Sequence, residues 1–238
     1  MDFQANKDLI FQNVAQIVEK ENRLKNSVNI IAVTKYVDCE TAKKLVDTGI
    51  KHIGENRVDK FLEKYHALKE ENLIWHLIGS LQRRKVKDVI NYVDYFHALD
   101  SVKLAQEINK RADHVINCFL QVNISKEESK HGFLVEELDS VLPELAALEN
   151  ICIVGLMTMA PLEADHQELN QIFSEAHQLQ LNLQSKQLKN MPFSDLSMGM
   201  SRDYPEAIAN GSTYVRIGTA FFLNRKELCH LKINLINL

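Results

Sequence analysis

Lys35 has the clearest chemical potential in this sequence, because it follows closely on a short apolar segment, residues 28–33, that is rich in valine and isoleucine. An amine that is withdrawn from water has a lowered pKa and attacks a carbonyl carbon more readily. The position therefore favours covalent chemistry with a carbonyl compound. The alternative is a lysine that extends its amine into solvent at the rim of the fold.

Two glycine-containing segments near the end of the chain have the composition of an anion site. Residues 197–201 read Ser-Met-Gly-Met-Ser, and residues 211–219 end in Arg216, Ile217, Gly218 and Thr219. Small residues let backbone N–H groups approach a ligand, and the loops after the last two strands of a β/α barrel are a common phosphate site. Hydroxyls and an arginine accompany the glycines, which favours a phosphate site over simple turn chemistry.

These residues need a scaffold in which strands and helices alternate. The chain opens with an amphipathic helix, in which Ile10, Val14, Ile17 and Val18 share one face. Eight short apolar segments follow, and strands are predicted at about residues 28–33, up to 54, 73–78, 93–99, 115–124, 151–157, up to 197 and 214–217. This alternation predicts an α/β fold, a (β/α)8 TIM barrel with an extra N-terminal helix. An open, doubly wound sheet is the alternative. No linker-like segment divides residues 1–238, so a single domain is predicted.

In a β/α barrel the functional side chains gather where strands run into the following loops. The polar residues on or just after the predicted strands are Thr34, Lys35, Glu55, Asn56, His76, Ser80, Asp100, Asn123, Ser125, Thr158, Ser197, Ser201, Arg216 and Thr219. We expect the site to be drawn from this set.

The composition argues against several other functions. The net charge of −4 does not suit a general nucleic-acid binder or a polybasic membrane surface. The basic run at residues 83–87 is better explained as a solvated helix face. His52, His76 and His97 are isolated in the sequence and show no metal-ligand spacing, so no metal site is predicted.

The cysteines and the N-terminal segment point to the cytoplasm. The four cysteines, at positions 39, 118, 152 and 229, form no C-x-x-C pair, which is typical of reduced, mostly buried thiols. The first residues lack the continuous apolar segment of a signal peptide, and no stretch of the sequence is long enough to span a bilayer.

Six short motifs carry a resemblance to a known family. They are A-V-T-K at residues 32–35, H-I-G-E-N at 52–56, W-H-L-I-G at 75–79, N-I-S-K-E-E-S-K-H-G at 123–132, G-L-M-T-M at 155–159 and G-M-S-R-D-Y-P-E-A-I-A-N-G-S-T-Y-V-R-I-G-T-A-F-F at 199–222. Together they resemble the pyridoxal phosphate homeostasis proteins, whose fold resembles the barrel domain of bacterial alanine racemase. The last motif is highly specific.

The resemblance implies that the cofactor is pyridoxal 5'-phosphate (PLP). Lys35 would form the internal aldimine with PLP, and Arg216 would face the pyridine nitrogen. The resemblance places the remaining contacts at Asn56 and His76 near the ring, and at Met200, Ser201, Gly218 and Thr219 around the phosphate.

The sequence also departs from the family pattern. Tyr36 stands where the family usually has threonine, Asp59 stands where it usually has glutamine, and residues 79–85 differ in part. These departures affect the rim of the cofactor site and any partner surface, but not Lys35, Ser201 or Arg216.

The same residues favour a carrier over an enzyme. An arginine beside the pyridine nitrogen keeps that nitrogen unprotonated, which weakens PLP as an electron sink. Racemases also take a second acid–base group from a second domain, whereas one short segment follows Phe222 here. We expect a monomeric carrier or buffer of PLP, without efficient catalysis, that hands PLP to apo forms of PLP-dependent enzymes. A weak amino-acid racemase is the alternative, and an interaction module with a purely structural cofactor is a third reading.

Overall fold

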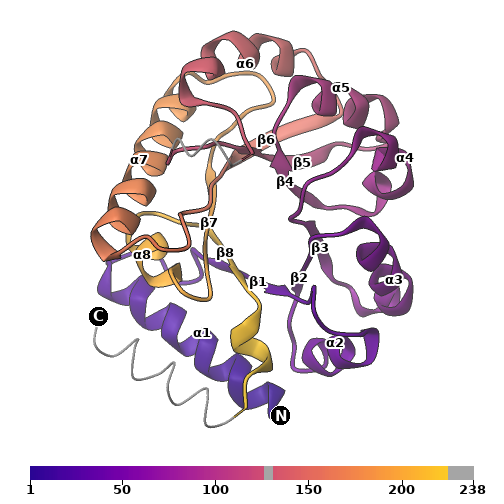
Figure 1. The fold of residues 1–238 in the computed structure, drawn as a ribbon, viewed down its shortest axis with the longest axis vertical. Coiled ribbons are helices and arrows are strands. Elements are labelled where there is room, and N and C mark those ends of the chain that lie inside the picture. The colour runs from indigo at the N-terminus through magenta and orange to yellow at the C-terminus, as the bar shows by residue number, and fades with distance from the viewer. Residues whose placement is uncertain (126–130, 225–238) are drawn as a thin grey trace.

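The computed structural model describes residues 1–125 and 131–224, in which eight parallel strands close into a barrel. Each strand pairs with the next along the chain, and the last pairs with the first (Figure 1). The strands are β1 (Asn29–Val33), β2 (His52–Glu55), β3 (Ile74–Leu77), β4 (Tyr95–Leu99), β5 (Ile116–Gln121), β6 (Ile151–Met157), β7 (Asp195–Met200) and β8 (Tyr214–Ile217). The predicted (β/α)8 barrel is confirmed, and the open sheet is excluded.

The helices form an outer ring around the strands (Figure 1). They are α1 (Phe3–Lys20), α2 (Cys39–Val46), α3 (Val58–Leu68), α4 (Val86–Val89), α5 (Val102–Arg111), α6 (Leu138–Ala146), α7 (His166–Ser185) and α8 (Tyr204–Ala209). The described residues also form five short 3-10 helices: η1 (Lys69–Glu71), η2 (Arg83–Lys85), η3 (Ile90–Tyr92), η4 (Val135–Glu137) and η5 (Thr219–Phe222). The extra N-terminal helix is confirmed as α1.

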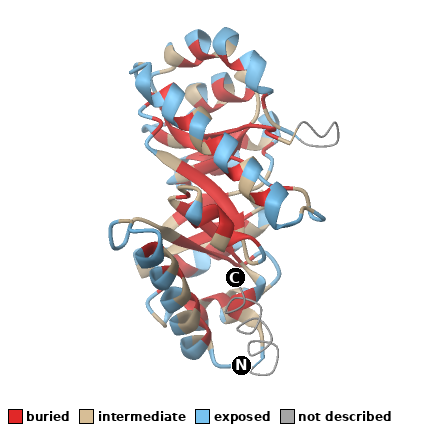
Figure 2. Ribbon diagram, turned by 90° about the vertical axis from the view of Figure 1, so that its left-hand side faces the viewer, coloured by how far each residue is buried: buried red, intermediate tan, exposed pale blue. Residues whose placement is uncertain are grey.

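The strands are buried on both faces, as their near-continuous apolar sequences predict (Figure 2). On the outer face, Ile10 and Val14 of α1 join a cluster with Ile30 and Val215 of β1 and β8. Successive side chains of a strand point to opposite faces. Ile31 follows Ile30 and Arg216 follows Val215, so Ile31 and Arg216 point inward, and the two residues are paired in register. Arg216 therefore points into the barrel.

The seventh strand differs from the prediction. The small residues after Ser197 suggested that the strand ends there, but β7 begins at Asp195 and runs to Met200. The glycine within this run, Gly199, adopts a φ of 92°, and a Cβ there would lie 2.6 Å from the Cβ of Ala207. Gly199 thus lets α8 pack closely against the strand, and Ser197 lies within β7 instead of at its end.

The remaining sequence features are placed as follows. The basic run begins in η2 and continues into α4, with Arg83, Arg84 and Lys87 exposed. Among the described cysteines, which are free thiols, Cys118 is buried and the other two are half-buried. Cys229 and residues 126–130 of the fourth motif lie outside the described residues. Within the described part of the chain, no helix is long and apolar enough to cross a membrane.

Candidate functional site

The predicted site residues come from segments that are neighbours in the barrel. Lys35 follows β1, Asn56 follows β2, His76 lies on β3, Met200 ends β7 and Arg216 lies on β8. The strands β7, β8, β1, β2 and β3 are consecutive in the closed barrel. Because the strands are parallel, the residues that follow them gather at one end of the barrel. One arc of the C-terminal end therefore holds most of the predicted site.

The sequence suggested that the Lys35 amine is withdrawn from water, but the structure places it in solvent. β1 ends at Val33, and the chain turns at Lys35, with the Val37 N–H donating to the Thr34 carbonyl at 3.1 Å. The Lys35 side chain is exposed, and its Nζ lies 4.8 Å from the centre of the Tyr36 ring, a cation–π contact. That expectation is wrong because the turn carries the amine out of the apolar environment of the strand.

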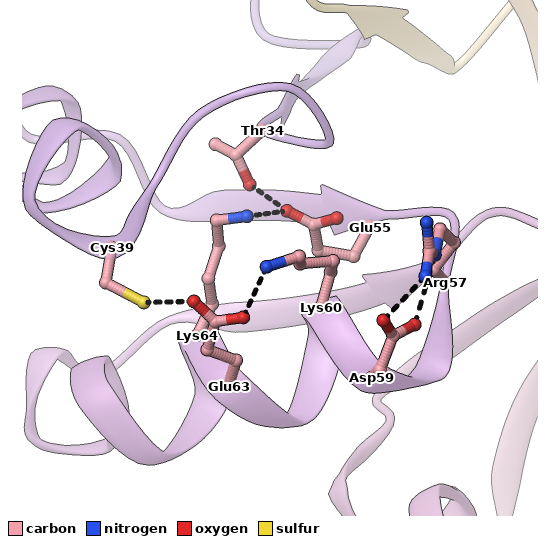
Figure 3. A network of polar contacts seen from close by, with 8 residues as sticks. All are labelled: Thr34, Cys39, Glu55, Arg57, Asp59, Lys60, Glu63 and Lys64. Carbon is pink, nitrogen blue, oxygen red and sulfur yellow. Dashed lines mark hydrogen bonds and ion pairs between the residues drawn. The ribbon is translucent and has the colours of Figure 1, made fainter.

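The residue before Lys35 is firmly anchored (Figure 3). Thr34 Oγ1 donates to Glu55 Oε1 at 2.6 Å, and Lys64 Nζ of α3 forms an ion pair with the same oxygen at 2.6 Å. The Glu55 and Lys64 side chains are 0% and 1% exposed. The Thr34 N–H also donates to the Gly54 carbonyl, which extends the β1–β2 pairing by one residue. The base of the Lys35 turn is fixed, while the amine is free to reach a ligand.

The loops after β7 and β8 meet at the same end. The Gly218 N–H donates to Ser201 Oγ at 3.3 Å, and both residues are half-buried. A Cβ on Gly218 would lie 3.3 Å from the Val33 carbonyl, so this loop also lies against the end of β1. Thr219 is exposed, and the Met200 N–H already donates to Asp203 Oδ1 at 2.5 Å. The contacts thus bring the hydroxyl and N–H donors of two loops close to the start of the Lys35 turn.

Asn56 lies where the loop after β2 approaches the loop after β3. It is half-buried after β2, and a Cβ on Gly79, after β3, would lie only 2.1 Å from the Asn56 carbonyl. Glycine at position 79 therefore allows these two loops to pack against each other.

Arg216 is a buried cation inside the barrel, 5% exposed. Its Nη1 donates to Ser197 Oγ at 2.6 Å and to the Ser197 carbonyl at 2.7 Å, and its Nη2 donates to the Thr158 carbonyl at 3.0 Å. Burial lowers the pKa of Arg216 to about 10, against the attraction of the Asp203 carboxylate. The guanidinium therefore keeps its charge at neutral pH.

His76 lies in the barrel interior, where the structure joins it to the two other histidines that are isolated in the sequence. Its Nε2 is 2.9 Å from Nδ1 of His52, and its Nδ1 is 2.9 Å from Nε2 of His97. His97 Nδ1 is in turn 2.8 Å from Ser197 Oγ. Both ring nitrogens of His76 are engaged, so any influence on a ligand at Arg216 passes through His97 and Ser197.

Sequence reasoning missed the roles of His97, Ser197 and Lys64. For His76 the alternation of side chains along β3 could have predicted an inward direction. Its neighbour Trp75 packs outward against Phe61 and Tyr65 of α3. The period of two then directs His76 inward. Among the described residues, no group of histidine, cysteine, aspartate and glutamate side chains is arranged to hold a metal ion.

The barrel, with its polar residues at the C-terminal end, belongs to the class of alanine racemase-like barrels. The family model of the alanine racemase N-terminal domain matches residues 6–226. An alanine racemase from Corynebacterium glutamicum superposes with a TM-score of 0.65 at 14% identity, over 92% of this chain and 62% of that chain. At this identity the likeness shows the fold alone.

Other relatives are more similar. The pyridoxal phosphate homeostasis protein of Aquifex aeolicus is 37% identical, over 91% of this chain and 96% of that protein. PipY of Synechococcus elongatus PCC7942, with structures solved without PLP and with PLP bound, is 32% identical at a TM-score of 0.78, over 88% of this chain and 100% of that chain. The chain belongs to the family of pyridoxal phosphate homeostasis proteins, which confirms the resemblance seen in its motifs.

Proposed function

We propose that the protein binds PLP at the C-terminal end of the barrel and acts in PLP homeostasis as a carrier or buffer. The proposal is carried by the meeting of Ser201 and Gly218 beside the end of β1, which leads into Lys35. These groups suit a small aldehyde with a phosphate, because they combine an accessible amine with hydroxyl and N–H donors. The structure of the relative PipY with PLP bound supports PLP as the ligand.

The residues would divide the work as follows. PLP, when bound, supplies an aldehyde that condenses with amines. Lys35 would bond covalently to the aldehyde carbon, Arg216 would donate a hydrogen bond toward the pyridine nitrogen, and the phosphate would be held by Ser201, Gly218, Thr219 and Met200. Asn56 would lie beside the ring, and His76 would act on it indirectly. For Met200 and Gly218 this requires each N–H to be shared with, or released by, its present acceptor, which is Asp203 for Met200 and Ser201 for Gly218.

The exposure of Lys35 supports a carrier. An amine in an exposed turn leaves the covalent link open to attack by water or by a second amine, so that PLP can be released to apo forms of PLP-dependent enzymes. We propose that the chain does this as a cytoplasmic, monomeric, single-domain protein over residues 1–238.

The covalent link is tested with Lys35→Ala. The purified protein should show a cofactor absorbance band that shifts on borohydride treatment, and the variant should lose the reducible adduct while keeping some noncovalent binding. Lys60→Ala is a matched control, because Lys60 is a half-buried lysine of α3 that is paired with Glu63 (Figure 3). Peptide mapping of reduced wild-type protein that finds the adduct on Lys60 or Lys85 would overturn the assignment.

A further inference from the structure

A continuous chain of hydrogen bonds crosses the barrel interior below the proposed site. It runs from the Arg216 guanidinium through Ser197 Oγ to His97, His76 and His52, with each step between 2.6 and 2.9 Å. The five residues come from β8, β7, β4, β3 and β2. His52, the first residue of β2, is half-buried, so the chain leads from the buried cation to the N-terminal end of the barrel.

The guanidinium fixes the direction of this chain. Arginine only donates hydrogen bonds, so Ser197 Oγ must accept from Arg216. The Ser197 oxygen could accept a second hydrogen bond, but the described residues offer its hydroxyl hydrogen no acceptor besides Nδ1 of His97. His97 Nδ1 is therefore assigned as the unprotonated acceptor of the Ser197 hydroxyl. A neutral imidazole carries its hydrogen on one nitrogen, so His97 carries it on Nε2 and donates to His76 Nδ1.

The same rule continues to the outer end. His76 accepts at Nδ1 and donates from Nε2 to His52 Nδ1, which leaves the His52 hydrogen on Nε2. Burial lowers the pKa of all three histidines, which keeps the imidazoles neutral, as the chain requires. In the opposite direction, the Ser197 hydroxyl hydrogen would lose its acceptor on His97.

The aromatic lining holds the rings in place. Tyr95 stacks on His76, with ring centroids 4.9 Å apart, and Phe119 stacks on His97 at 4.4 Å. This packing restricts rotation of both imidazole rings, which favours a single arrangement of the chain.

We propose that His97, acting through Ser197, positions the Arg216 guanidinium, and that Arg216 in turn imposes a single tautomer on all three histidines. His97 and Ser197 are positioning residues, because Arg216 is the member of the chain that would face a ligand. The part of this inference that concerns PLP rests on the proposed function; the part that concerns the tautomers does not.

The tautomers are tested first, on cofactor-free protein with ¹⁵N-labelled histidine. Long-range ¹H–¹⁵N spectra at pH 7.5 should show His52, His76 and His97 neutral, with the hydrogen on Nε2. Ser197→Ala should remove this preference at His97. Ser194→Ala, at an exposed serine just before β7, should leave it unchanged. Protonation of His97 at Nδ1 in the wild-type protein would overturn the inference.

The coupling to PLP is tested second. Ser197→Ala should weaken PLP binding about two- to tenfold, because one hydrogen bond to Arg216 is lost, and should shift the cofactor absorbance in the same direction as Arg216→Ala. In the Arg216→Ala background, Ser197→Ala should have no further effect. Fully additive effects would show that Ser197 does not act through Arg216. A wild-type protein with the expected tautomers but no cofactor absorbance would instead refute the proposed function and leave the chain intact.

Discussion

Arg216 concentrates the electrostatics of the site in one side chain. Its guanidinium is charged at neutral pH, buried, and held by three hydrogen bonds to Ser197 and Thr158. A ligand nitrogen that faces it can only accept a hydrogen bond, since arginine has no acceptor. A pyridine nitrogen in this position stays unprotonated, so the ring stabilises a neighbouring carbanion poorly. The residue that would hold PLP thereby also restrains its chemistry.

The phosphate contacts are testable one hydroxyl at a time. Ser201→Ala and Thr219→Ala should each weaken PLP binding about ten- to a hundredfold, because a hydrogen bond to a charged group contributes about 1.5–3 kcal/mol. Absorbance titration measures the affinity. Ser80→Ala is the control, since Ser80 is an exposed serine that follows β3 at the same end of the barrel. If both variants bind PLP as the wild type does, the phosphate lies elsewhere.

At this scale the sequence predicted positions better than environments. Lys35 and Arg216 could be picked out because each lies on or just after a β-branched segment. The exposure of the Lys35 side chain could not be decided from the sequence, because it depends on where the turn after β1 begins. The bond between His97 and Ser197 joins residues 100 positions apart across the barrel, and no local pattern records such a contact.

Among the secondary-structure elements, α3 carries an ion pair that braces the Lys35 turn. Lys64→Met should lower the free energy of unfolding by about 3–5 kcal/mol, because it leaves the buried Glu55 carboxylate without its cation. Urea unfolding measures the change. Lys60→Met breaks an exposed pair with Glu63 on the same helix, and should cost less than about 1 kcal/mol.

A double variant separates stability from positioning. Glu55→Leu with Lys64→Met replaces the pair by apolar side chains and should recover most of the lost stability. It still removes the acceptor of Thr34 Oγ1 at the base of the Lys35 turn, so the double variant should bind PLP more weakly than the wild type. Equal losses from Lys60→Met and Lys64→Met would show that the buried pair has no special role.

The elements themselves followed from the sequence where apolar runs were short and well separated. All eight strands and α1 could be placed on this basis. The end of β7 could not be predicted, because Ser197, Gly199 and Ser201 resemble a loop. The strand continues to Met200 because this residue pairs with Arg216 of β8 in the closed barrel.

For the whole molecule, the histidine chain links the barrel to acid stability. Burial lowers the pKa of His76 and His97 well below the ordinary value, with repulsion from Arg216 adding to the effect at His97, whereas Asp94 favours protonation of His52. Unfolded histidines titrate near about pH 6.5. Above this pH the stabilisation is complete. Below this pH the histidines of the unfolded state become protonated while those of the folded state stay neutral, so the free energy of unfolding falls.

Cofactor-free protein should therefore lose stability between pH 7.5 and pH 5.5, by at most about 1.4 kcal/mol for each of His76 and His97. Thermal unfolding across this range measures the loss. His76→Gln should flatten the dependence, whereas His114→Gln, at an exposed histidine, should leave it unchanged. A wild-type melting temperature that is constant down to pH 5.5 would contradict the prediction.

PLP held in this barrel should bind without supporting efficient turnover. Inversion at an α-carbon needs two acid–base groups on opposite faces of the substrate. Lys35 can serve one face, but His76 has both ring nitrogens engaged by His52 and His97, and Arg216 keeps the electron sink weak. Exchange of the α-proton of alanine or serine in heavy water, followed by NMR, should therefore stay near the rate with free PLP. A kcat for racemisation in the ordinary enzyme range, about 1–1,000 per second, would make the protein an amino-acid racemase instead of a carrier.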